Sequence, residues 1–472
     1  MSGPATPESV ELLVLGAGPA GHKAAIQAAK AGKRVLIVDR DPSAGGECVQ
    51  RGTIPSKTLR ESANYLVGLR ARSEGVIDVS VPAQTKVASL MRRLKAVRAS
   101  HGSYLNEQLE RNQVERLHGR ARFLSSEVVE IRSPDRRVRR VRAERIVIAT
   151  GSRPRQPDNV PVDHEHVLDS DSILALIYLP QSLTVLGAGV IACEFASIFA
   201  ALGVKVTMVD AGARPLSFLD PELTTCYVSA FERMGGVFVP GKKVERVHWD
   251  GAAVVTRLAS GEELRAEKCL CAQGRVANVA ELGLEAAGLA LTPRGHIPVD
   301  ANLRTVVPNI YAAGDVIGPP ALAATAVEQG RRAARHAFGL PTHGANEVVP
   351  VGIYTIPEIA TVGLSEEQAL AKFGSAHVGR SMFGELARAL INGQTDGLLK
   401  LIADPAGKLV GAHIVGEAAI ELVHVAQMAL VGGLTLEAFV DNVFNFPTMA
   451  EAYRVAAIDA VAKMLTVQRR AA

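Results

Sequence analysis

A glycine motif that occurs twice constrains the fold of this chain more than any other feature. The first copy, Gly16-Ala17-Gly18-Pro19-Ala20-Gly21, follows an apolar segment at 11–15 and precedes an alanine-rich segment that ends near Lys30. A second apolar segment, 34–38, leads to Asp39. In a strand–turn–helix–strand motif, glycines allow a tight turn against a pyrophosphate, the helix start offers free N–H groups, and the acid accepts bonds from ribose hydroxyls. The expected dinucleotide-binding residues are Gly16, Gly18, Gly21, Asp39 and Arg40.

The second copy spans 183–210 and lies at a constant offset of 171 positions from the first. The counterparts of the first motif's three glycines and acid are Gly187, Gly189, Ala192 and Asp210. A constant offset indicates one supersecondary motif used twice. Two such motifs suit an enzyme that retains a flavin dinucleotide and exchanges a nicotinamide dinucleotide. With 472 residues, the chain is long enough for two to four domains.

One basic run raises the alternative of a nucleic-acid-binding surface. It contains Arg136, Arg137, Arg139, Arg140, Arg142 and Arg145. The run has no interleaved aromatic residues and lies between two strand-like segments, and the net charge of the whole chain is only +4. These features favour a solvated hairpin over a nucleic-acid site. We therefore expect no nucleic-acid partner.

The five cysteines are an odd and scattered set, which is unlike the disulfide framework of a secreted protein. Cys269 and Cys271 share one face of an expected strand, but no second pair of ligands lies at zinc spacing, so we expect them to fill a core and expect no metal. The N-terminus has no signal-peptide pattern. The apolar stretch 183–209 contains three glycines and Glu194, which argues against a membrane span. A cytoplasmic protein is expected.

The segment 45–60, G-G-E-C-V-Q-R-G-T-I-P-S-K-T-L-R, resembles the redox-active segment of the flavin-dependent pyridine nucleotide–disulfide oxidoreductases. In that family, two cysteines separated by four residues form a disulfide against the flavin. This chain keeps the first as Cys48 but has Thr53 in place of the second. A hydroxyl can neither form a disulfide nor relay electrons as a dithiol. We therefore expect Cys48 to be a thiol packed beside the flavin ring rather than a catalytic group.

Further stretches resemble other motifs of the same family. The stretch 149–154 resembles the linker that leaves the flavin domain, and 309–316 resembles the second flavin motif, in which Asp315 would accept hydrogen bonds from polyol hydroxyls. The residues that the resemblance adds to the expected cofactor sites are Gly46, Cys48, Thr53, Lys57, Thr150, Gly151, Gly274, Arg275 and Asp315.

The resemblance covers nearly the whole chain and implies its organisation. The implied fold class is α/β, with two Rossmann-like, doubly wound, three-layer nucleotide-binding domains and a C-terminal α+β dimerisation domain. The expected segments are 1–152 for the first part of the FAD-binding domain, 153–272 for the NAD(P)-binding domain, 273–348 for the second part of the FAD-binding domain, and 349–472 for the dimerisation domain. A homodimer or a higher oligomer is implied.

A second departure from the family occurs near the C-terminus. In disulfide-reducing members, a His-Pro-Thr segment from the partner subunit supplies the base that takes the thiol proton, whereas this chain has Phe446-Pro447-Thr448. Glu451 matches the carboxylate that orients the missing histidine. Together with Thr53, Phe446 removes both the electron relay and its proton base. The resemblance then implies FAD-dependent hydride transfer between NADPH and NAD without a redox-active disulfide.

Two residues match a catalytic pair that lies beside the reactive flavin nitrogen in the family. Lys57 would stabilise negative charge on the flavin, and Glu194 would hold the lysine in place. The alternatives are a surface lysine at a helix start and a solvated glutamate, although Glu194 has apolar neighbours. In the second motif, Asp210 would accept ribose hydroxyls, and Arg214 is either a partner for the 2′-phosphate of NADP or a surface arginine.

Two other functions stay open at this point. A NAD(P)H dehydrogenase would keep the flavin but pass electrons to a quinone or another small acceptor. A flavoprotein that only senses nucleotide redox state would need a blocked nicotinamide site, and the intact turn at 187–192 argues against it. Because only two dinucleotide motifs are present, the expected mechanism is ping-pong, with NAD(H) and NADP(H) using the second motif in succession.

Overall fold

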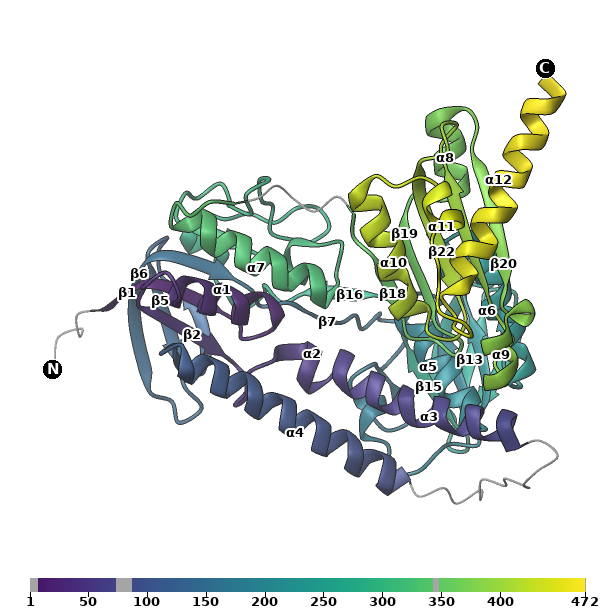
Figure 1. Cartoon of the computed structure of the whole chain (residues 1–472). Coiled ribbons are helices and arrows are strands. Elements are labelled where there is room, and N and C mark those ends of the chain that lie inside the picture. The colour runs from purple at the N-terminus through teal and green to yellow at the C-terminus, as the bar shows by residue number, and fades with distance from the viewer. Residues whose placement is uncertain (1–6, 74–86, 343–347, 472) are drawn as a thin grey trace, which may run out of the picture. The chain divides into compact units, whose positions relative to one another are not determined.

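A computed structural model describes residues 7–73, 87–342 and 348–471. It divides the chain into two compact units, and Figure 1 shows their elements. The first unit comprises Met1–Thr58, Met91–Arg155 and Gly274–Ala345, and the second comprises Leu59–Leu90, Gln156–Gln273 and Asn346–Ala472. Helices α3 (Thr53–Ser73) and α4 (Val87–Arg111) each begin in one unit and end in the other. The division into four functional segments stays a prediction.

The first unit is built on a seven-stranded sheet with the path β3-β2-β1-β6-β5-β4, to which β17 is added beside β6. The pairs among β1, β2, β3, β6 and β17 are parallel, and β4 and β5 extend the sheet in antiparallel fashion. Its strands are β1 (Glu8–Leu15), β2 (Val35–Asp39), β3 (Glu115–His118), β4 (Arg120–Phe123), β5 (Val128–Arg132), β6 (Val138–Ile148) and β17 (Ile310–Ala312). A separate two-stranded ribbon pairs β7 (Ser152–Pro154) with β16 (Arg275–Ala277).

Alternate residues of β1 enter two different cores, as the period of two in a strand requires. Leu12 and Val14 pack with alanines of α1 (Pro19–Ala29) and α7 (Ala323–Ala337). Leu13 and Leu15 pack on the opposite face, against β4, β5 and the segment 277–316. The sheet is therefore buried on both sides, which is the three-layer arrangement expected from the sequence. The short elements of this unit are α2 (Gly46–Gln50), η2 (Leu284–Ala287) and η3 (Asp315–Ile317).

The second unit repeats this topology in the parallel sheet β11-β10-β9-β15-β8. Helix α5 (Val190–Ala201) connects β9 (Ser182–Leu186) to β10 (Lys205–Val209), just as α1 connects β1 to β2, which confirms the predicted repeat. The other elements of this part are β8 (Val167–Leu168), η1 (Ser172–Ala175), α6 (Pro221–Arg233), β11 (Val237–Val239), β12 (Val244–Trp249), β13 (Val254–Leu258), β14 (Glu263–Ala266) and β15 (Lys268–Cys271).

A second sheet of this unit, formed by residues beyond 348, is antiparallel and has the order β18-β19-β22-β21-β20. One of its faces packs against α10 and α12, with Leu399, Leu401 and Tyr453 fully buried. The elements are β18 (Val351–Ile353), β19 (Ile359–Gly363), α8 (Glu366–Phe373), β20 (His377–Met382), η4 (Phe383–Glu385), α9 (Ala387–Asn392), β21 (Leu398–Ala403), β22 (Leu409–Val415), α10 (Ala419–Gly432), α11 (Glu437–Asp441) and α12 (Glu451–Ala471). The α/β class with a C-terminal α+β part is thus confirmed.

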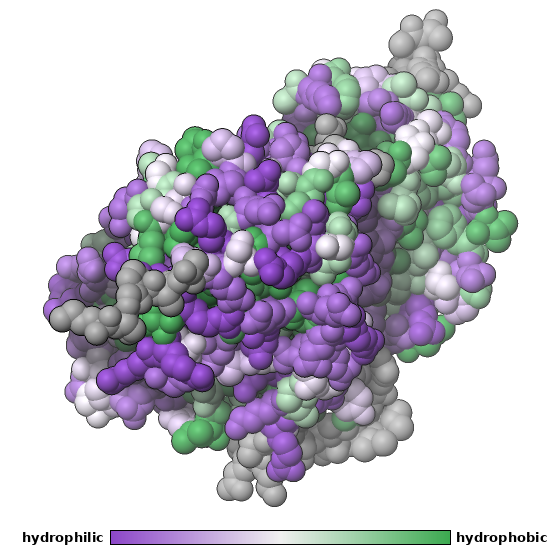
Figure 2. Space-filling model, turned by 90° about the vertical axis from the view of Figure 1, so that its left-hand side faces the viewer, coloured by the Kyte–Doolittle hydropathy of each residue, from purple (hydrophilic) through white to green (hydrophobic). Residues whose placement is uncertain are grey.

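The arginine run lies in the hairpin of β5 and β6, as predicted. Its side chains pair with carboxylates on the same surface: Arg142 with Glu127, and Arg139 with Glu115 and another glutamate. Figure 2 shows this side of the first unit as mainly hydrophilic. Local pairing of this kind is typical of a solvated strand face.

One further expectation agrees with the structure: Cys269 and Cys271 of β15 are buried in an apolar core of the second unit. No cluster of metal-ligating side chains occurs within 7–73, 87–342 and 348–471. Among these same residues, no helix is both long and apolar enough to cross a membrane.

Candidate functional sites in the two units

The first dinucleotide turn places a glycine where no side chain fits. Gly16 has φ +105°, and a Cβ atom there would lie 2.3 Å from the Ala149 carbonyl oxygen. Strand β1 therefore passes directly against the end of β6 before α1 begins at Pro19, with Gly18 as the N-cap residue. The backbone N–H groups of this helix start have no side-chain cap, which leaves them available to an anion.

Asp39 ends β2 and is held next to this turn. One carboxylate oxygen accepts from Ala17 N at 2.5 Å and the other accepts from Asp41 N at 2.8 Å. The side chain is buried, and burial raises its pKa although these two hydrogen bonds act to lower it. Each carboxylate oxygen can accept another bond, so the geometry suits ribose hydroxyls. Arg40 is exposed, and its carbonyl oxygen lies 3.0 Å from His118 Nε2.

The segment before α2 covers the first turn. Gly45 N donates to Ala17 O at 2.8 Å, and a Cβ at Gly46 would lie 2.7 Å from Gly18 Cα. Gly46 also has φ +55°, so both its conformation and this backbone contact require glycine. The structure thus joins two motifs that are distant in sequence, the glycine turn and the segment of Cys48.

Cys48 of α2 and Thr53, the first residue of α3, lie next to each other. The Thr53 hydroxyl hydrogen-bonds to the Cys48 sulfur, and Cys48 is a free thiol. Burial raises the pKa of this thiol, more than the bond from Thr53 and the nearby charge of Lys57 lower it. A thiol with a raised pKa is a poor nucleophile at neutral pH. Lys57 lies on the first turns of α3, close enough for its charge to act on Cys48.

A polar network connects two further predicted cofactor residues, Asp315 and Arg275. Asp315 accepts from the Ser152 hydroxyl at 2.6 Å, and Arg275 donates to both the hydroxyl and the carbonyl of Ser152. The same guanidinium pairs with Glu47 at 3.1 Å. Four segments of the first unit are thereby tied together at one place.

Thr150 and Gly151 lie at the end of β6, beside this network. Asn278 holds their backbone, because its side chain donates to Thr150 O and its N–H donates to Gly151 O. The Thr150 hydroxyl is buried without a hydrogen-bond partner among the residues that the structure describes. An unsatisfied buried hydroxyl in a native fold calls for a partner. A polar ligand atom would supply one, so the residues fit a dinucleotide.

The second dinucleotide turn has the same backbone but a different environment. Gly187 has φ +105°, like Gly16, and a Cβ there would lie 2.8 Å from the Ala272 carbonyl oxygen. Beyond it, a Cβ on Gly189 would meet no atom within 4 Å, and Ala192 fits in the place of the first motif's third glycine. Gly189 is therefore more open than Gly18, although Leu216 N donates to Ala188 O at 2.9 Å, as Gly45 N donates to Ala17 O in the first turn.

Asp210 and Arg214 belong to the loop that follows β10. Asp210 accepts from Gly212 N at 2.6 Å. The Arg214 guanidinium donates to the carbonyls of Leu219 and Ser217, each at 2.8 Å, so it holds its own loop together. A role of Arg214 toward the 2′-phosphate of NADP stays a prediction.

Glu194 is buried in α5, with only 4% of its surface exposed, so the alternative of a solvated residue is wrong. It accepts from Tyr354 N at 2.9 Å, which ties α5 to the segment after β18. The predicted partnership of Glu194 with Lys57 joins residues of the two units and stays a prediction.

Phe446, which occupies the position of the family's histidine, lies near the start of α12 and is 75% exposed. Glu451, which matches the carboxylate that orients this histidine in the family, instead accepts a hydrogen bond from Thr448 N at 3.2 Å.

Residue-by-residue reading of the sequence missed three members of the first site: Glu47, Ser152 and Asn278. None of the three had a local signal in the sequence. Glu47 acts through a distant arginine, and the roles of Ser152 and Asn278 arise from the pairing of β7 with β16 and its surroundings.

Comparisons with known proteins agree with this geometry. Residues 10–330 match the model of the pyridine nucleotide-disulphide oxidoreductase family, and residues 349–457 match that of its dimerisation domain. A protein from Mycobacterium tuberculosis (strain H37Ra) named soluble pyridine nucleotide transhydrogenase is 44% identical, and the match covers 96% of this chain and 97% of that protein. A protein of the same name from Marinomonas sp. is 40% identical, with coverage of 96% and 98%.

Solved structures of the same architecture superimpose on nearly the whole chain. LpdA from Mycobacterium tuberculosis has a TM-score of 0.88 at 27% identity, covering 95% of this chain and 99% of that one. The HOCl-induced flavoprotein disulfide reductase RclA from Escherichia coli has a TM-score of 0.86 at 26% identity, with coverage of 95% and 99%. The chain therefore belongs to the pyridine nucleotide-disulphide oxidoreductase family.

Proposed function

We propose that this protein is an FAD-dependent transhydrogenase that passes hydride between NADPH and NAD. The observation that carries the proposal is the contact of Thr53 with Cys48: the position of a second cysteine holds a hydroxyl, and the remaining thiol has a raised pKa. A disulfide relay needs two sulfurs and an accessible thiolate. The names of the relatives that match over nearly their full length support the same activity.

The first unit supplies the residues that would hold FAD. The uncapped start of α1 faces the pyrophosphate position of the motif, Asp39 has acceptor capacity for ribose, and the buried Thr150 hydroxyl needs a partner. When bound, the flavin supplies a ring that accepts a hydride from one nicotinamide and returns it to another. Gly46 and its neighbours cover the turn, which favours permanent retention of this cofactor.

The second unit supplies the residues that would bind the nicotinamide nucleotides. Its turn at Gly187 and Gly189 has the same shape as the first, and Gly189 is more open than Gly18, which favours exchange of the ligand. Because one of two dinucleotide motifs is taken by FAD, donor and acceptor would use this site in succession, in a ping-pong scheme. Lys57 would stabilise charge that develops on the cofactor, and Glu194 would orient Lys57.

No proton base is needed for this reaction. Hydride leaves NADPH and arrives on NAD, so the products are NADP and NADH and no net proton is released. An exposed Phe446 at the position of the family's histidine is compatible with such chemistry, whereas thiol–disulfide exchange requires a proton acceptor.

The direct test is anaerobic reduction of the purified holoenzyme, followed at the flavin absorbance. NADPH should bleach the flavin band, and subsequent NAD should restore it with formation of NADH. Restoration by a quinone but not by NAD would instead identify a NAD(P)H dehydrogenase. A folded preparation without a flavin spectrum would refute the assignment of FAD to the first unit.

Steady-state kinetics test the one-site scheme separately. Initial rates measured over both substrates should give parallel double-reciprocal lines, with competitive inhibition by each nucleotide at high concentration. Intersecting lines would show a ternary complex and would refute the scheme while leaving the activity intact.

The assembly and the cellular location belong to the same proposal. The match of residues 349–457 to a dimerisation domain supports a homodimer. Five free cysteines, three of them buried, support a reducing compartment, and we propose the cytoplasm.

A further inference from the structure

Lys400 is a buried lysine in the middle of an apolar strand. Strand β21 reads Leu398-Leu399-Lys400-Leu401-Ile402-Ala403, and all six residues are buried. Leu399 and Leu401 pack in the core with α10 and α12, so Lys400 points from the opposite face of the sheet. A fully buried lysine requires partners that compensate for its lost hydration.

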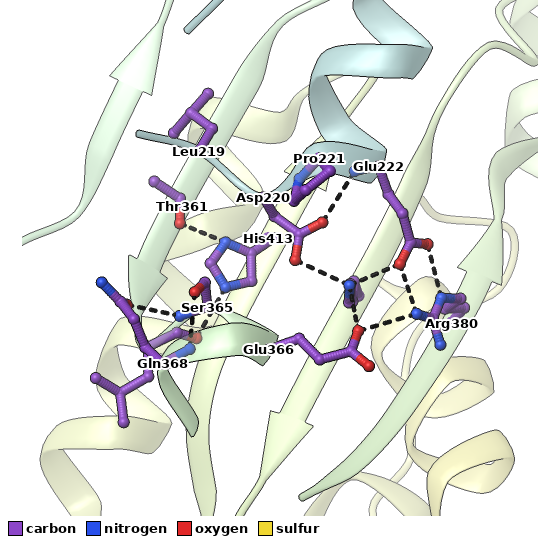
Figure 3. A network of polar contacts seen from close by, with 12 residues as sticks. Leu219, Asp220, Pro221, Glu222, Thr361, Ser365, Glu366, Gln368, Arg380 and His413 are labelled. Atoms are coloured by element: carbon purple, nitrogen blue, oxygen red, sulfur yellow. Dashed lines mark hydrogen bonds and ion pairs between the residues drawn. The ribbon is translucent and has the colours of Figure 1, made fainter. Parts of the chain in front are cut away.

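The strand register places Lys400 in a polar row that crosses four strands. Thr361 of β19 pairs with His413 of β22, His413 pairs with Lys400, and Lys400 pairs with Arg380 of β20. His413 is fixed within the row, because Nδ1 lies 2.6 Å from Thr361 Oγ1 and Nε2 lies 2.9 Å from Leu364 O. Figure 3 shows Thr361, His413 and Arg380 of this row, with Pro221 and Glu222 at the start of α6.

Three carboxylates converge on the Lys400 ammonium group. Nζ lies 2.8 Å from Asp220, 2.6 Å from Glu222 and 2.6 Å from Glu366. Burial alone would lower the pKa of Lys400, but the three carboxylates outweigh it and raise the pKa, so the group is charged. The arrangement uses all three donors of an ammonium group.

Arg380 is a second cation of this cluster, with a different set of partners. It forms a two-pronged contact with Glu222 at 2.7 and 2.5 Å, and it reaches Glu366 at 3.1 Å. The bond from Arg380 is the main reason why the pKa of Glu222 falls to about 2. Of the two cations, Lys400 is the one that bonds to Asp220, at 2.8 Å, among the residues that the structure describes.

Asp220 connects this cluster to the nucleotide loop of the second dinucleotide motif. Its other carboxylate oxygen accepts from Glu222 N at 3.0 Å and caps α6. The residue before it, Leu219, receives the bond from Arg214 and donates its own N–H to Leu216 O. Leu216 N in turn donates to Ala188 O, at 2.9 Å, within the glycine turn.

An unbroken series of short contacts therefore runs from Lys400 to the glycine turn at 187–189. Each link is a hydrogen bond or a peptide bond, and Leu216 and Leu219 are themselves buried. We propose that Lys400 is a positioning residue for nucleotide binding, which holds the loop 210–219 in the conformation that the dinucleotide requires. The inference rests on the proposed function, because it assumes that this loop binds the adenosine part of NAD(P).

The experiment compares Lys400→Met with Arg380→Met in the holoenzyme. Both variants remove one buried or half-buried cation from the same cluster, but Lys400→Met also releases Asp220. Binding of ADP-ribose is measured by calorimetry, together with thermal stability, flavin content, kcat and KM. Without Lys400, the loop 210–219 would have to become ordered when the ligand binds, and this ordering lowers the affinity. We therefore expect about tenfold weaker binding for Lys400→Met. KM should rise for both nicotinamide nucleotides while the flavin content stays unchanged.

Arg380→Met should lose stability but bind ADP-ribose like the wild type. Equal weakening in both variants would mean a general loosening of the fold, and wild-type binding by Lys400→Met would show that the loop needs no such support; either result overturns the proposal. If Lys400→Met does not fold, Asp220→Asn replaces it, because asparagine keeps the helix cap but loses the charged contact. Wild-type binding by that variant overturns the proposal equally.

This design separates the two proposals. A wild-type enzyme that binds ADP-ribose but does not transfer hydride from NADPH to NAD would refute the proposed reaction, and the binding comparison would still test Lys400. A wild-type enzyme that does not bind ADP-ribose would refute both.

Discussion

Arg275 and Glu47 form an ion pair with an N–O distance of 3.1 Å, although 228 positions separate them in the sequence. Both side chains are largely shielded from solvent, and Arg275 also holds Ser152, which donates to Asp315. The pair thus fixes the segment of Cys48 to the segment that carries the second flavin motif.

Arg275→Met should weaken FAD binding by about tenfold, because Glu47 and Ser152 each lose a charged donor and Asp315 loses its orientation. The measurement is the dissociation constant of FAD for the apoprotein, by quenching of flavin fluorescence. Arg120→Met is the matched control, since the Arg120–Glu281 pair is exposed and should contribute little. An unchanged constant for Arg275→Met would show that the network is dispensable.

Cys48→Ser should retain hydride transfer between NADPH and NAD. The Thr53 hydroxyl can bond to serine as it does to the thiol, and the thiol takes no part in the proposed reaction. Turnover of both proteins is compared in the transhydrogenase assay and with lipoamide or glutathione disulfide. Disulfide reduction by the wild type at rates comparable to hydride transfer would contradict this prediction.

Arg214→Ala should raise KM for NADPH and NADH by similar factors. The guanidinium holds two carbonyls of its own loop, so its removal loosens the binding site for both nucleotides. The ratio of kcat/KM for the two substrates is the decisive quantity. A selective loss of NADPH use would instead show that Arg214 contacts the 2′-phosphate.

The stability of the first unit should decrease as the pH falls from about 6.5 to about 4. Burial lowers the pKa of His22 from 6.5 to about 4, although its bond to Leu105 O opposes this shift. As the pH falls, His22 binds a proton in the unfolded chain before it does so in the folded one. The contribution of neutral His22 to the free energy of unfolding is therefore complete above pH 6.5 and is lost below it, by about 2 kcal/mol between pH 7 and pH 5.

His22→Gln removes this titration and should flatten the dependence. Urea unfolding of both proteins at pH 7 and pH 5, followed by a probe in the first unit, measures the difference. An identical pH dependence in the variant would exclude His22 as its source.

Charged substitutions on α10 should dissociate the proposed dimer. Val425, Met428 and Val431 recur every three residues on one side of this helix and are 39%, 59% and 64% exposed. Apolar stripes of this kind are typical of interfaces. Met428→Glu should give a monomer in sedimentation velocity. Ile177→Glu is the control, because Ile177 is 85% exposed but lies outside the dimerisation domain. A Met428→Glu variant that remains dimeric would place the interface elsewhere.

Much of the architecture followed from the sequence because it depends on local rules. The constant offset between the two glycine motifs predicted two strand–turn–helix–strand motifs, and the turns at Gly16 and Gly187 indeed share φ +105°. The second copy, predicted at 183–210, forms β9, α5 and β10. Backbone conformation and short-range periodicity act within a few residues, so a single sequence carries their signal.

The sites depended on tertiary structure wherever a side chain's partner is distant in the chain. The sequence indicated that Asp315 and Arg275 are cofactor residues, but not that Ser152 connects them, since that contact requires the pairing of β7 with β16. It also did not indicate that Glu47 pairs with Arg275, which lies 228 positions away.

Lys400 illustrates the same limit. A lysine between leucines is visible in the sequence, yet its three carboxylate partners come from α6, its N-cap and α8, and only the folded register brings them to one point. The sequence by itself determined which segments form strands, helices and tight turns, because these follow from local conformational preference. The tertiary structure decided which charges meet, because burial makes a charge depend on partners that only the fold can bring to it.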